Sequence, residues 1–239
     1  MTILTYQLDS YSKSLEALVT AVDEQNHAIQ LDRTIFFPGG GGQPYDTGEI
    51  VFSQRSALIS RAKKTGGEIW HFLQPESPLP AMSEHVVAHI DWDRRYKLMR
   101  THTAMHILCG VVYRDYGALV TGGDMEPLKG RMDFEFENLS RDLVQVIEAS
   151  VNREVQAAHE VRVKILPREE AFQIPDLIRT KINLLPAEIA EIRTVELVGL
   201  DLQADGGTHV ANTREVGPMR IVDYKSKGKI NKRIYVELD

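Results

Sequence analysis

Two patterns of apolar and polar residues divide the chain, and the first covers roughly its first ninety residues. Short apolar runs there are separated by turn residues, which is typical of the strands of a small barrel. Proline-rich residues 75–80 are expected to form a loop between two of them. The expected strands are Ala28–Leu31, Thr34–Phe37, Gly48–Phe52, Ala57–Ile59 and Ile69–Leu73.

After Asp91 the pattern changes to one of mixed helices and strands. Arg94–Tyr116 is rich in apolar residues and has no proline, which predicts a helix. Ser140 is a suitable N-cap for a second helix that continues to about Ala158. Val161–Leu166 alternates apolar with basic residues, as a strand does. The chain is therefore expected to be α+β, with a β-barrel domain at residues 1–90 and a second, α+β domain at residues 91–239.

Composition and charge narrow the possible classes of protein. Hydrophobic residues make up 43% of the 239 positions, which is enough for a core. No apolar run approaches the ~18 residues that cross a bilayer, and the start lacks a secretory signal, so no membrane contact and a cytoplasmic location are expected. A net charge of -6 argues against a general nucleic-acid coating protein. The basic run Arg220–Arg233 is either a solvated surface or a contact for a phosphate backbone.

Histidine spacing offers a candidate metal site. His102 and His106 are four residues apart, so they lie on one face of the expected helix and can chelate a single ion. Such pairs also arise on packed or solvated helix faces. Asp205 and His209, in Asp-Gly-Gly-Thr-His, have the same spacing, and that segment is either a plain hairpin turn or a second pair of ligands. Together the two pairs would supply four ligands, or three and a water.

Other candidate ligands fit less well. One cysteine in the chain excludes a disulfide framework and a Cys-rich zinc site. Cys109 lies seven residues beyond His102, which separates their backbones by roughly 10 Å along a helix, so it is expected to be a small buried apolar residue. Gln203 is a weaker candidate. His85 and His89 fall in a strand-like stretch, where this spacing is about 13 Å, so they are not expected to share a metal.

Four successive glycines, Gly39–Gly42, mark the first part of the chain. A segment this flexible either makes a turn that other residues cannot reach or approaches a ligand closely, and both alternatives are open. It is not a phosphate-binding P-loop, because no Gly-Lys-Ser/Thr sequence follows.

The order of these motifs resembles that of a known family. Thr34–Gly48, Asp91–His106, Asp205–Gly217 and the basic run Lys225–Arg233 follow one another as in the AlaX family of alanyl-tRNA trans-editing proteins. The editing domain of alanyl-tRNA synthetase has the same order. The glycine-rich first part is similar to the medium-length AlaX form, and a chain of this length is expected to have no aminoacylation domain.

The resemblance implies a fold and an activity. It implies a β-barrel followed by an editing domain like those of alanyl- and threonyl-tRNA synthetases, with zinc bound by His102, His106 and His209. The expected enzyme is a deacylase that hydrolyses Ser-tRNA(Ala), or Gly-tRNA(Ala), in trans. Asp205 stands where the family often has cysteine, so either its carboxylate or a water takes the fourth position. Met105 stands where relatives often have threonine.

Substrate contacts are expected from several further residues. Thr121 and Thr208 are candidates for recognising the serine hydroxyl, with a core or turn threonine as the alternative. Two other functions stay open: a zinc hydrolase of small esters or amides, and a tRNA-binding module inactivated by Asp205. Expected contacts to the substrate or its phosphates come from Gly41, Gly42, Gln43, Lys97, Arg100, Lys129, Arg131, Lys227 and Lys229, whose basic members are ordinary solvated charges in the alternative interpretation.

Overall fold

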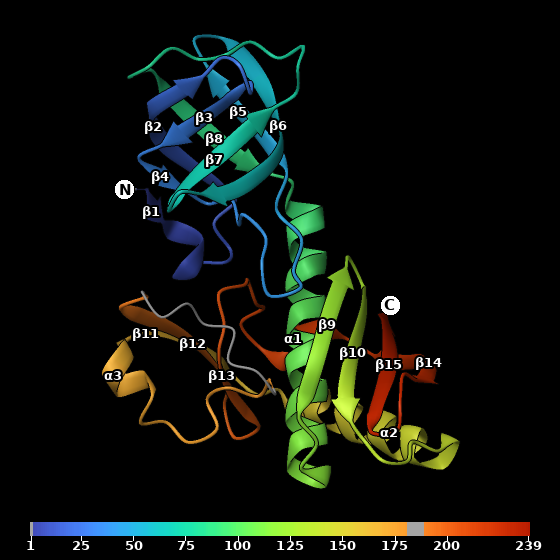
Figure 1. The fold of residues 1–239 in the computed structure, drawn as a ribbon. Helices are drawn as coiled ribbons and strands as arrows, with labels where there is room; N and C mark the ends of the chain where they lie inside the picture. The colour runs from blue at the N-terminus through green and yellow to red at the C-terminus, as the bar shows by residue number, and fades with distance from the viewer. Residues whose placement is uncertain (1, 181–188) are drawn as a thin grey trace. The chain divides into compact units, whose positions relative to one another are not determined.

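The computed structural model describes residues 2–180 and 189–239 (Figure 1). The chain divides into two compact units, Met1–Tyr96 and Lys97–Asp239. Helix α1 (Trp92–Tyr116) begins in the first unit and continues through the second. No helix in the described parts of the chain is both long and apolar enough to cross a membrane.

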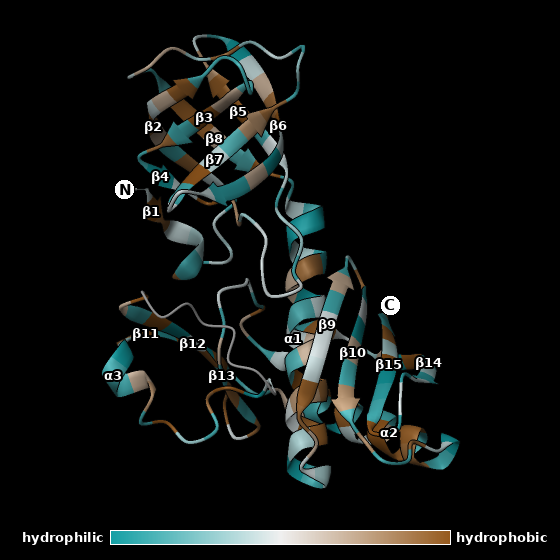
Figure 2. Cartoon of the chain, viewed as in Figure 1, coloured by the Kyte–Doolittle hydropathy of each residue, from teal (hydrophilic) through white to brown (hydrophobic). Residues whose placement is uncertain are grey.

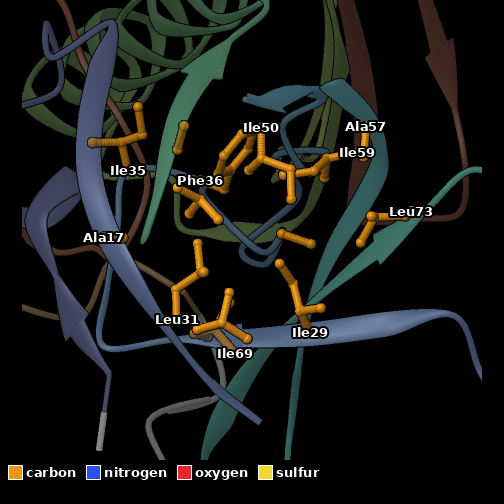
Figure 3. Packing of buried hydrophobic residues seen from close by; sticks show 14 of the residues in the cluster. Ala17, Ile29, Leu31, Ile35, Phe36, Ile50, Ala57, Ile59, Ile69 and Leu73 are labelled. Atoms are coloured by element: carbon orange, nitrogen blue, oxygen red, sulfur yellow. The ribbon is translucent and has the colours of Figure 1, made fainter. Parts of the chain in front are cut away.

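The first unit contains a closed six-stranded barrel in which all neighbouring strands are antiparallel. Apolar and polar residues alternate along its strands (Figure 2), so one set of side chains fills the interior. Ile29, Leu31 and Ile50 are among the buried residues (Figure 3). The expected small barrel is confirmed. Its strand order is β2 (Ser14–Asp23), β3 (Ala28–Leu31), β7 (Glu68–Leu73), β6 (Arg55–Thr65), β5 (Gly48–Phe52) and β8 (His85–Ile90).

The expected strand Thr34–Phe37 is wrong. Strand β4 covers only Arg33–Thr34, pairs with β1 (Ile3–Leu4), and is followed by an irregular segment. Ile35 and Phe36 are apolar because they are fully buried in the barrel core, not because they belong to a strand. Side chains satisfy the backbone there, since the Phe36 N–H donates to Thr34 Oγ1 at 3.0 Å and the Phe37 N–H to Asp46 Oδ2 at 2.7 Å.

Gly48, at the start of β5, marks a close approach between strands. A Cβ placed on it would lie 2.1 Å from the His89 carbonyl oxygen and 2.8 Å from Ile90 Cα. Backbone cannot move aside cheaply, so Gly48→Ala is expected to destabilise the unit by about 3 kcal/mol. Urea unfolding followed by tryptophan fluorescence measures this, because Trp70 and Trp92 both lie in the first unit.

A matched control is Gly66→Ala in the turn between β6 and β7. Gly66 has a φ of +60° and nothing within 4 Å of an added Cβ, so it tests backbone strain without a clash. Strain alone is expected to cost about 1 kcal/mol. Equal losses in the two variants would show that the close approach at Gly48 is not the cause.

His71, inside the barrel, predicts a pH-dependent stability. Its Nε2 lies 2.8 Å from Thr34 Oγ1 and its Nδ1 3.3 Å from the Ile29 carbonyl oxygen. Burial lowers the pKa of His71 from 6.5 to about 4. The unfolded chain therefore takes up the proton first as the pH falls, so stability present above pH 6.5 is lost progressively down to pH 4.

The expected loss across that interval is about 3 kcal/mol. Unfolding curves of the wild type and His71→Gln at several pH values measure it. Only the slope between pH 6.5 and 4 is compared, since the substitution also changes stability at neutral pH. An unchanged slope in the variant would contradict the assignment to this histidine.

The second unit combines helices with two antiparallel sheets. Helix α1 confirms the helix expected at 94–116, and residues 101–112 of it are all buried, which carries its histidines into the interior. Helix α2 (Arg141–Ala157) begins as expected, because Ser140 accepts a hydrogen bond from the Leu143 N–H and caps it. The strand expected at 161–166 is also present as β11 (Val161–Pro167).

The remaining elements of this unit follow α1 in the sequence and complete the two sheets. One sheet has the order β14–β15–β10–β9 and the other β11–β12–β13. The strands not yet given are β9 (Val120–Glu126), β10 (Lys129–Glu135), β12 (Glu191–Leu197), β13 (Asp201–Ala204), β14 (Met219–Ser226) and β15 (Asn231–Leu238). The unit also contains the short helix α3 (Arg168–Ala171) and the 3-10 turn η2 (Thr213–Val216). The first unit has one further 3-10 turn among its described residues, η1 (Thr5–Gln7).

Candidate metal centre

Four side chains from two distant segments converge in the second unit. His102 and His106 lie on consecutive turns of α1, and Asp205 and His209 follow strand β13. Each offers a ligand atom, and these atoms all lie within 4.8 Å of one another. All three histidines are buried, and their ring centroids are 4.2 to 5.2 Å apart. The structure thus brings together the four residues that the sequence indicates as ligands.

The atoms that face one another fit a tetrahedral ion. His102 Nε2 lies 3.4 Å from Asp205 Oδ1, and His209 Nε2 lies 3.0 Å from Asp205 Oδ2. Zinc binds such atoms at about 2.0–2.2 Å, which places neighbouring tetrahedral ligands about 3.3 Å apart. Three imidazole nitrogens and a carboxylate oxygen are a donor set that zinc accepts. The residues present therefore fit a zinc ion.

The loop that carries Asp205 and His209 is not a hairpin turn. It leads from β13 to the 3-10 turn η2 and joins no two paired strands. Asp205 holds the loop itself, since its Oδ2 accepts the Gly207 N–H at 2.7 Å and its carbonyl accepts from Arg193 Nη1 at 2.9 Å. The segment is a turn whose shape presents two ligands.

Further contacts orient each imidazole ring. Thr103 Oγ1 lies 3.2 Å from His209 Nδ1, and the backbone of Thr208 hydrogen-bonds to His102. His106 turns its Nδ1 to Asp201 Oδ2 at 3.2 Å, which leaves its Nε2 for the cluster. Partners of this kind select the tautomer and the orientation of metal-binding histidines.

Burial and charge set the protonation of the cluster. Burial lowers the pKa of His102 to about 4, against the charge of Asp205, which raises it. The pKa of His209 is also well below its usual value, chiefly through burial. Burial raises the pKa of Asp205, but His102 and a hydrogen bond from His209 outweigh it and hold that pKa well below the usual value. Burial lowers the pKa of His106 too, but its hydrogen bond to Asp201 and the charges of Asp205 and Asp201 outweigh burial and raise that pKa. Neutral His102 and His209 and an ionised Asp205 are in the forms that a metal ion requires.

Cys109 is buried, as the sequence predicts, and lies outside the cluster. Its Sγ accepts a hydrogen bond from Gln203 Nε2 at 3.3 Å, and burial raises the pKa of the thiol. Gln203 is likewise not in the cluster and donates to Asp201 instead, at 2.6 Å.

The two candidate threonines lie in different surroundings. Thr208 is fully buried next to His209 in the chain. Thr121 is exposed on β9, and its hydroxyl donates to Asn231 Oδ1 at 2.9 Å. Contact of either with a substrate stays a prediction.

The glycine-rich segment forms a tight turn. Gly40 and Gln43 exchange backbone hydrogen bonds of 3.0 and 2.9 Å across Gly41 and Gly42, whose φ angles are +59° and +87°. Positive φ at both corners strongly favours glycine. The turn interpretation is confirmed, whereas a contact between this turn and a substrate stays a prediction.

Several of the expected phosphate contacts are bonded within the chain. The Arg100 guanidinium donates to the Val216 and Asp239 carbonyl oxygens at 2.8 and 2.7 Å. Lys129 pairs with Glu237 at 3.1 Å. Arg131 lies 3.5 Å from Asp124.

The basic run near the C-terminus is also largely engaged. Lys225 pairs with Asp223 at 3.0 Å, and Arg233 donates to both carboxylate oxygens of Asp133 at 2.6 and 2.8 Å. Lys232 Nζ donates to two backbone carbonyls of the same hairpin. Arg220 and Lys225 are exposed but pair with carboxylates, at 3.2 Å from Asp239 and 3.0 Å from Asp223, and Lys227 and Lys229 are the other exposed cations among the described residues of this hairpin.

Two residues beside the cluster carry no signal in the sequence pattern. Asp201 reaches His106 because β13 begins there, and Arg193 reaches Asp205 because β12 pairs with β13. Neither has a ligand spacing, and a buried arginine or aspartate looks in sequence like any surface charge. Knowledge of the strand pairing is needed to find them.

Comparison with known proteins finds two family models that match this chain, and the second covers Asp205 and His209. The family model described as tRNA synthetases class II (A) matches residues 5–94, and the Threonyl and Alanyl tRNA synthetase second additional domain matches residues 192–235. The Alanyl-tRNA editing protein AlaX-M of Saccharolobus solfataricus is 41% identical over 237 residues, 98% of each chain. The AlaX-M protein of Methanosarcina acetivorans is 36% identical over 244 residues, covering 100% of this chain and 99% of its own.

A longer relative is similar to this chain over part of its own length. The Alanyl-tRNA editing protein AlaX-L of Pyrococcus horikoshii is 31% identical over 227 residues, which is 94% of this chain and 55% of that protein. Because the AlaX-M proteins match over nearly their whole length, this chain belongs to the AlaX family of alanyl-tRNA editing proteins.

Proposed function

We propose that this chain is an aminoacyl-tRNA deacylase that acts in trans on tRNA(Ala) carrying serine or glycine. The observation that carries the proposal is the convergence of His102, His106, Asp205 and His209 on one point. The AlaX-M relatives, named alanyl-tRNA editing proteins, support the substrate class. In this proposal residues 91–239 form the zinc-binding editing domain, and residues 1–90 form a barrel domain that contributes the glycine-rich turn. The protein acts in the cytoplasm.

The chemistry requires little beyond a positioned water. Serine is alanine with an added hydroxyl and glycine is alanine without its methyl, so a synthetase pocket for alanine rejects both poorly and a second, hydrolytic site is useful. The bond to be cut is an activated ester. A bound zinc would polarise the carbonyl or lower the pKa of a water. The three imidazoles would offer nitrogen lone pairs to that ion, and Asp205 would contribute its negative charge in place of the thiolate common in the family.

Polar groups that pair with the serine hydroxyl would make the enzyme hydrolyse Ser-tRNA(Ala) in preference to Ala-tRNA(Ala). Thr208, buried beside the cluster, is the better placed candidate, and Thr121 is the second. A hydrogen bond from such a group to the serine hydroxyl would favour serine, because alanine offers no hydroxyl to pair with. The terminal ribose and its phosphates are proposed to meet Gly41, Gly42, Gln43, Lys97, Arg100, Lys227 and Lys229.

The test is incubation with Ser-tRNA(Ala), Gly-tRNA(Ala) and Ala-tRNA(Ala), before and after removal of metal with a chelator. Release of the wrong amino acids only, lost on chelation and restored by zinc, is the expected result. Release in no tube would overturn the proposal and favour a tRNA-binding module. Hydrolysis of small aminoacyl esters as fast as of aminoacyl-tRNA would instead favour a general esterase.

A further inference from the structure

A buried carboxylate lies behind the metal centre, on the far side of the His106 ring from the cluster. The Asp201 side chain is 0% exposed, and its Oδ2 lies 3.2 Å from His106 Nδ1. The same oxygen accepts a hydrogen bond from Gln203 Nε2 at 2.6 Å. Taking a carboxylate out of water is costly unless hydrogen bonds compensate, so the placement of Asp201 needs a reason.

An ion pair with Arg179 compensates only part of this cost. Arg179 Nε donates to Asp201 Oδ1 at 3.5 Å, a longer contact than those of Oδ2 with His106 and Gln203. The Arg179 guanidinium also stacks over the Tyr113 ring, with its carbon 3.8 Å from the ring centroid. The shorter contacts of Asp201 are therefore those of Oδ2, which include the histidine.

Gly110 gives a second, independent observation. It lies one turn after His106 on the same face of α1, and a Cβ built on it would be 3.0 Å from Asp201 Cβ and 3.0 Å from Leu200 Cγ. Glycine in the middle of a helix costs about 1 kcal/mol relative to alanine. Here the missing side chain lets the start of β13 approach α1 closely enough for Asp201 to reach His106.

We propose that Asp201 is a positioning residue of the metal centre, which accepts the His106 Nδ1–H and so keeps the Nε2 lone pair directed at the cluster. Gln203 holds the carboxylate in place, and Gly110 provides the space for it. This assignment rests on the proposed zinc site and goes beyond it, because it names a residue that acts through a ligand. Carboxylate partners of this kind typically raise metal affinity 10- to 100-fold.

Zinc affinity, measured by competition with a chromophoric chelator, tests the assignment. Asp201→Leu is expected to weaken binding about 10- to 100-fold. Asp201→Asn retains an oxygen that accepts the same hydrogen bond, so it is expected to recover most of the affinity. Gly110→Ala is expected to push Asp201 away from α1 by a few tenths of an ångström, which lengthens its contact with His106 and weakens binding by up to about tenfold.

Asp133→Asn is the matched control. Asp133 is also a buried aspartate of the second unit, bonded to Arg233 rather than to a candidate ligand. Its replacement is expected to lower stability and leave zinc affinity unchanged. A loss of zinc affinity equal to that of the Asp201 variants would mean that general destabilisation is responsible, which overturns the assignment.

Nitrogen NMR of the histidine rings in metal-free protein gives a direct signature. The His106 ring is expected to carry its proton on Nδ1 in the wild type and in Asp201→Asn, and to lose that preference in Asp201→Leu. Normal zinc affinity and an unchanged tautomer in Asp201→Leu would overturn this assignment alone. Wild-type protein that binds no zinc would overturn the proposed metal site and this assignment together. If Asp201→Leu does not fold, unchanged affinity in Gly110→Ala decides against the assignment.

Discussion

Replacing His106 with alanine is expected to abolish stoichiometric zinc binding and to slow deacylation of Ser-tRNA(Ala) more than about 100-fold. The substitution removes one of three imidazoles in a buried cluster and leaves Asp201 without its histidine partner. Cys109, which lies outside the cluster, is not expected to replace that nitrogen, because it is bonded to Gln203 and its raised pKa keeps it as the neutral thiol. Metal analysis of purified protein and single-turnover deacylation measure the two effects.

The matched control is His85→Ala. His85 is an exposed histidine on β8, in the other unit, so its loss removes an imidazole without touching the cluster. Full zinc content and rate are expected there. Retention of zinc by His106→Ala would show that the ion binds elsewhere, and retention of the rate would show that the cluster is not the site of hydrolysis.

The sequence predicts the metal centre well because the relevant signals are local. A spacing of four residues places His102 and His106 on one helix face, and the same spacing in the downstream segment supplies Asp205 and His209. Which two segments meet is not a local property. The residue pattern offers this combination of segments only as one alternative, and the resemblance to AlaX proteins favours it.

The sheets and the buried ion pairs are harder to predict for the same reason. Strand β10 pairs with β15, about a hundred residues later, and no periodicity within either strand specifies that partner. Asp133 and Arg233 look like surface charges in the sequence, yet they form a two-bond ion pair across this junction. The apolar run Ile35–Phe37 is wrongly predicted as part of a strand, because buried residues without strand pairing give the same apolar pattern as a strand.

Asp46→Ala is expected to destabilise the first unit by about 3–5 kcal/mol, because it leaves a buried arginine without its counter-ion. Arg95 and Asp46 are 0% and 1% exposed, and Arg95 Nε lies 3.0 Å from both carboxylate oxygens. Asp46 Oδ2 also accepts the Phe37 N–H at 2.7 Å. One carboxylate thus neutralises the start of α1 and fixes the segment that leads into the glycine-rich turn.

Arg95 also donates to two backbone carbonyls, and these bonds limit how much stability a second substitution can restore. Its Nη1 donates to the Ser10 carbonyl at 3.0 Å and its Nη2 to the Ile35 carbonyl at 2.5 Å. Replacing both partners, in Asp46→Ala with Arg95→Met, removes the unpaired charge but leaves these two carbonyls without their donor. The double variant is therefore expected to recover part of the lost stability and to remain below the wild type.

Urea unfolding followed by tryptophan fluorescence separates this ion pair from an ordinary one, because both tryptophans report on the first unit. Arg33→Ala is the control, since Arg33 pairs with Asp32 at 3.1 Å with 47% of its side chain exposed, and its loss is expected to cost less than about 1 kcal/mol. Asp46→Asn keeps an acceptor for the Phe37 N–H but loses the charge, so an intermediate loss is expected. If Asp46→Ala cost no more than Arg33→Ala, the buried pair would not be what holds the glycine-rich segment against α1.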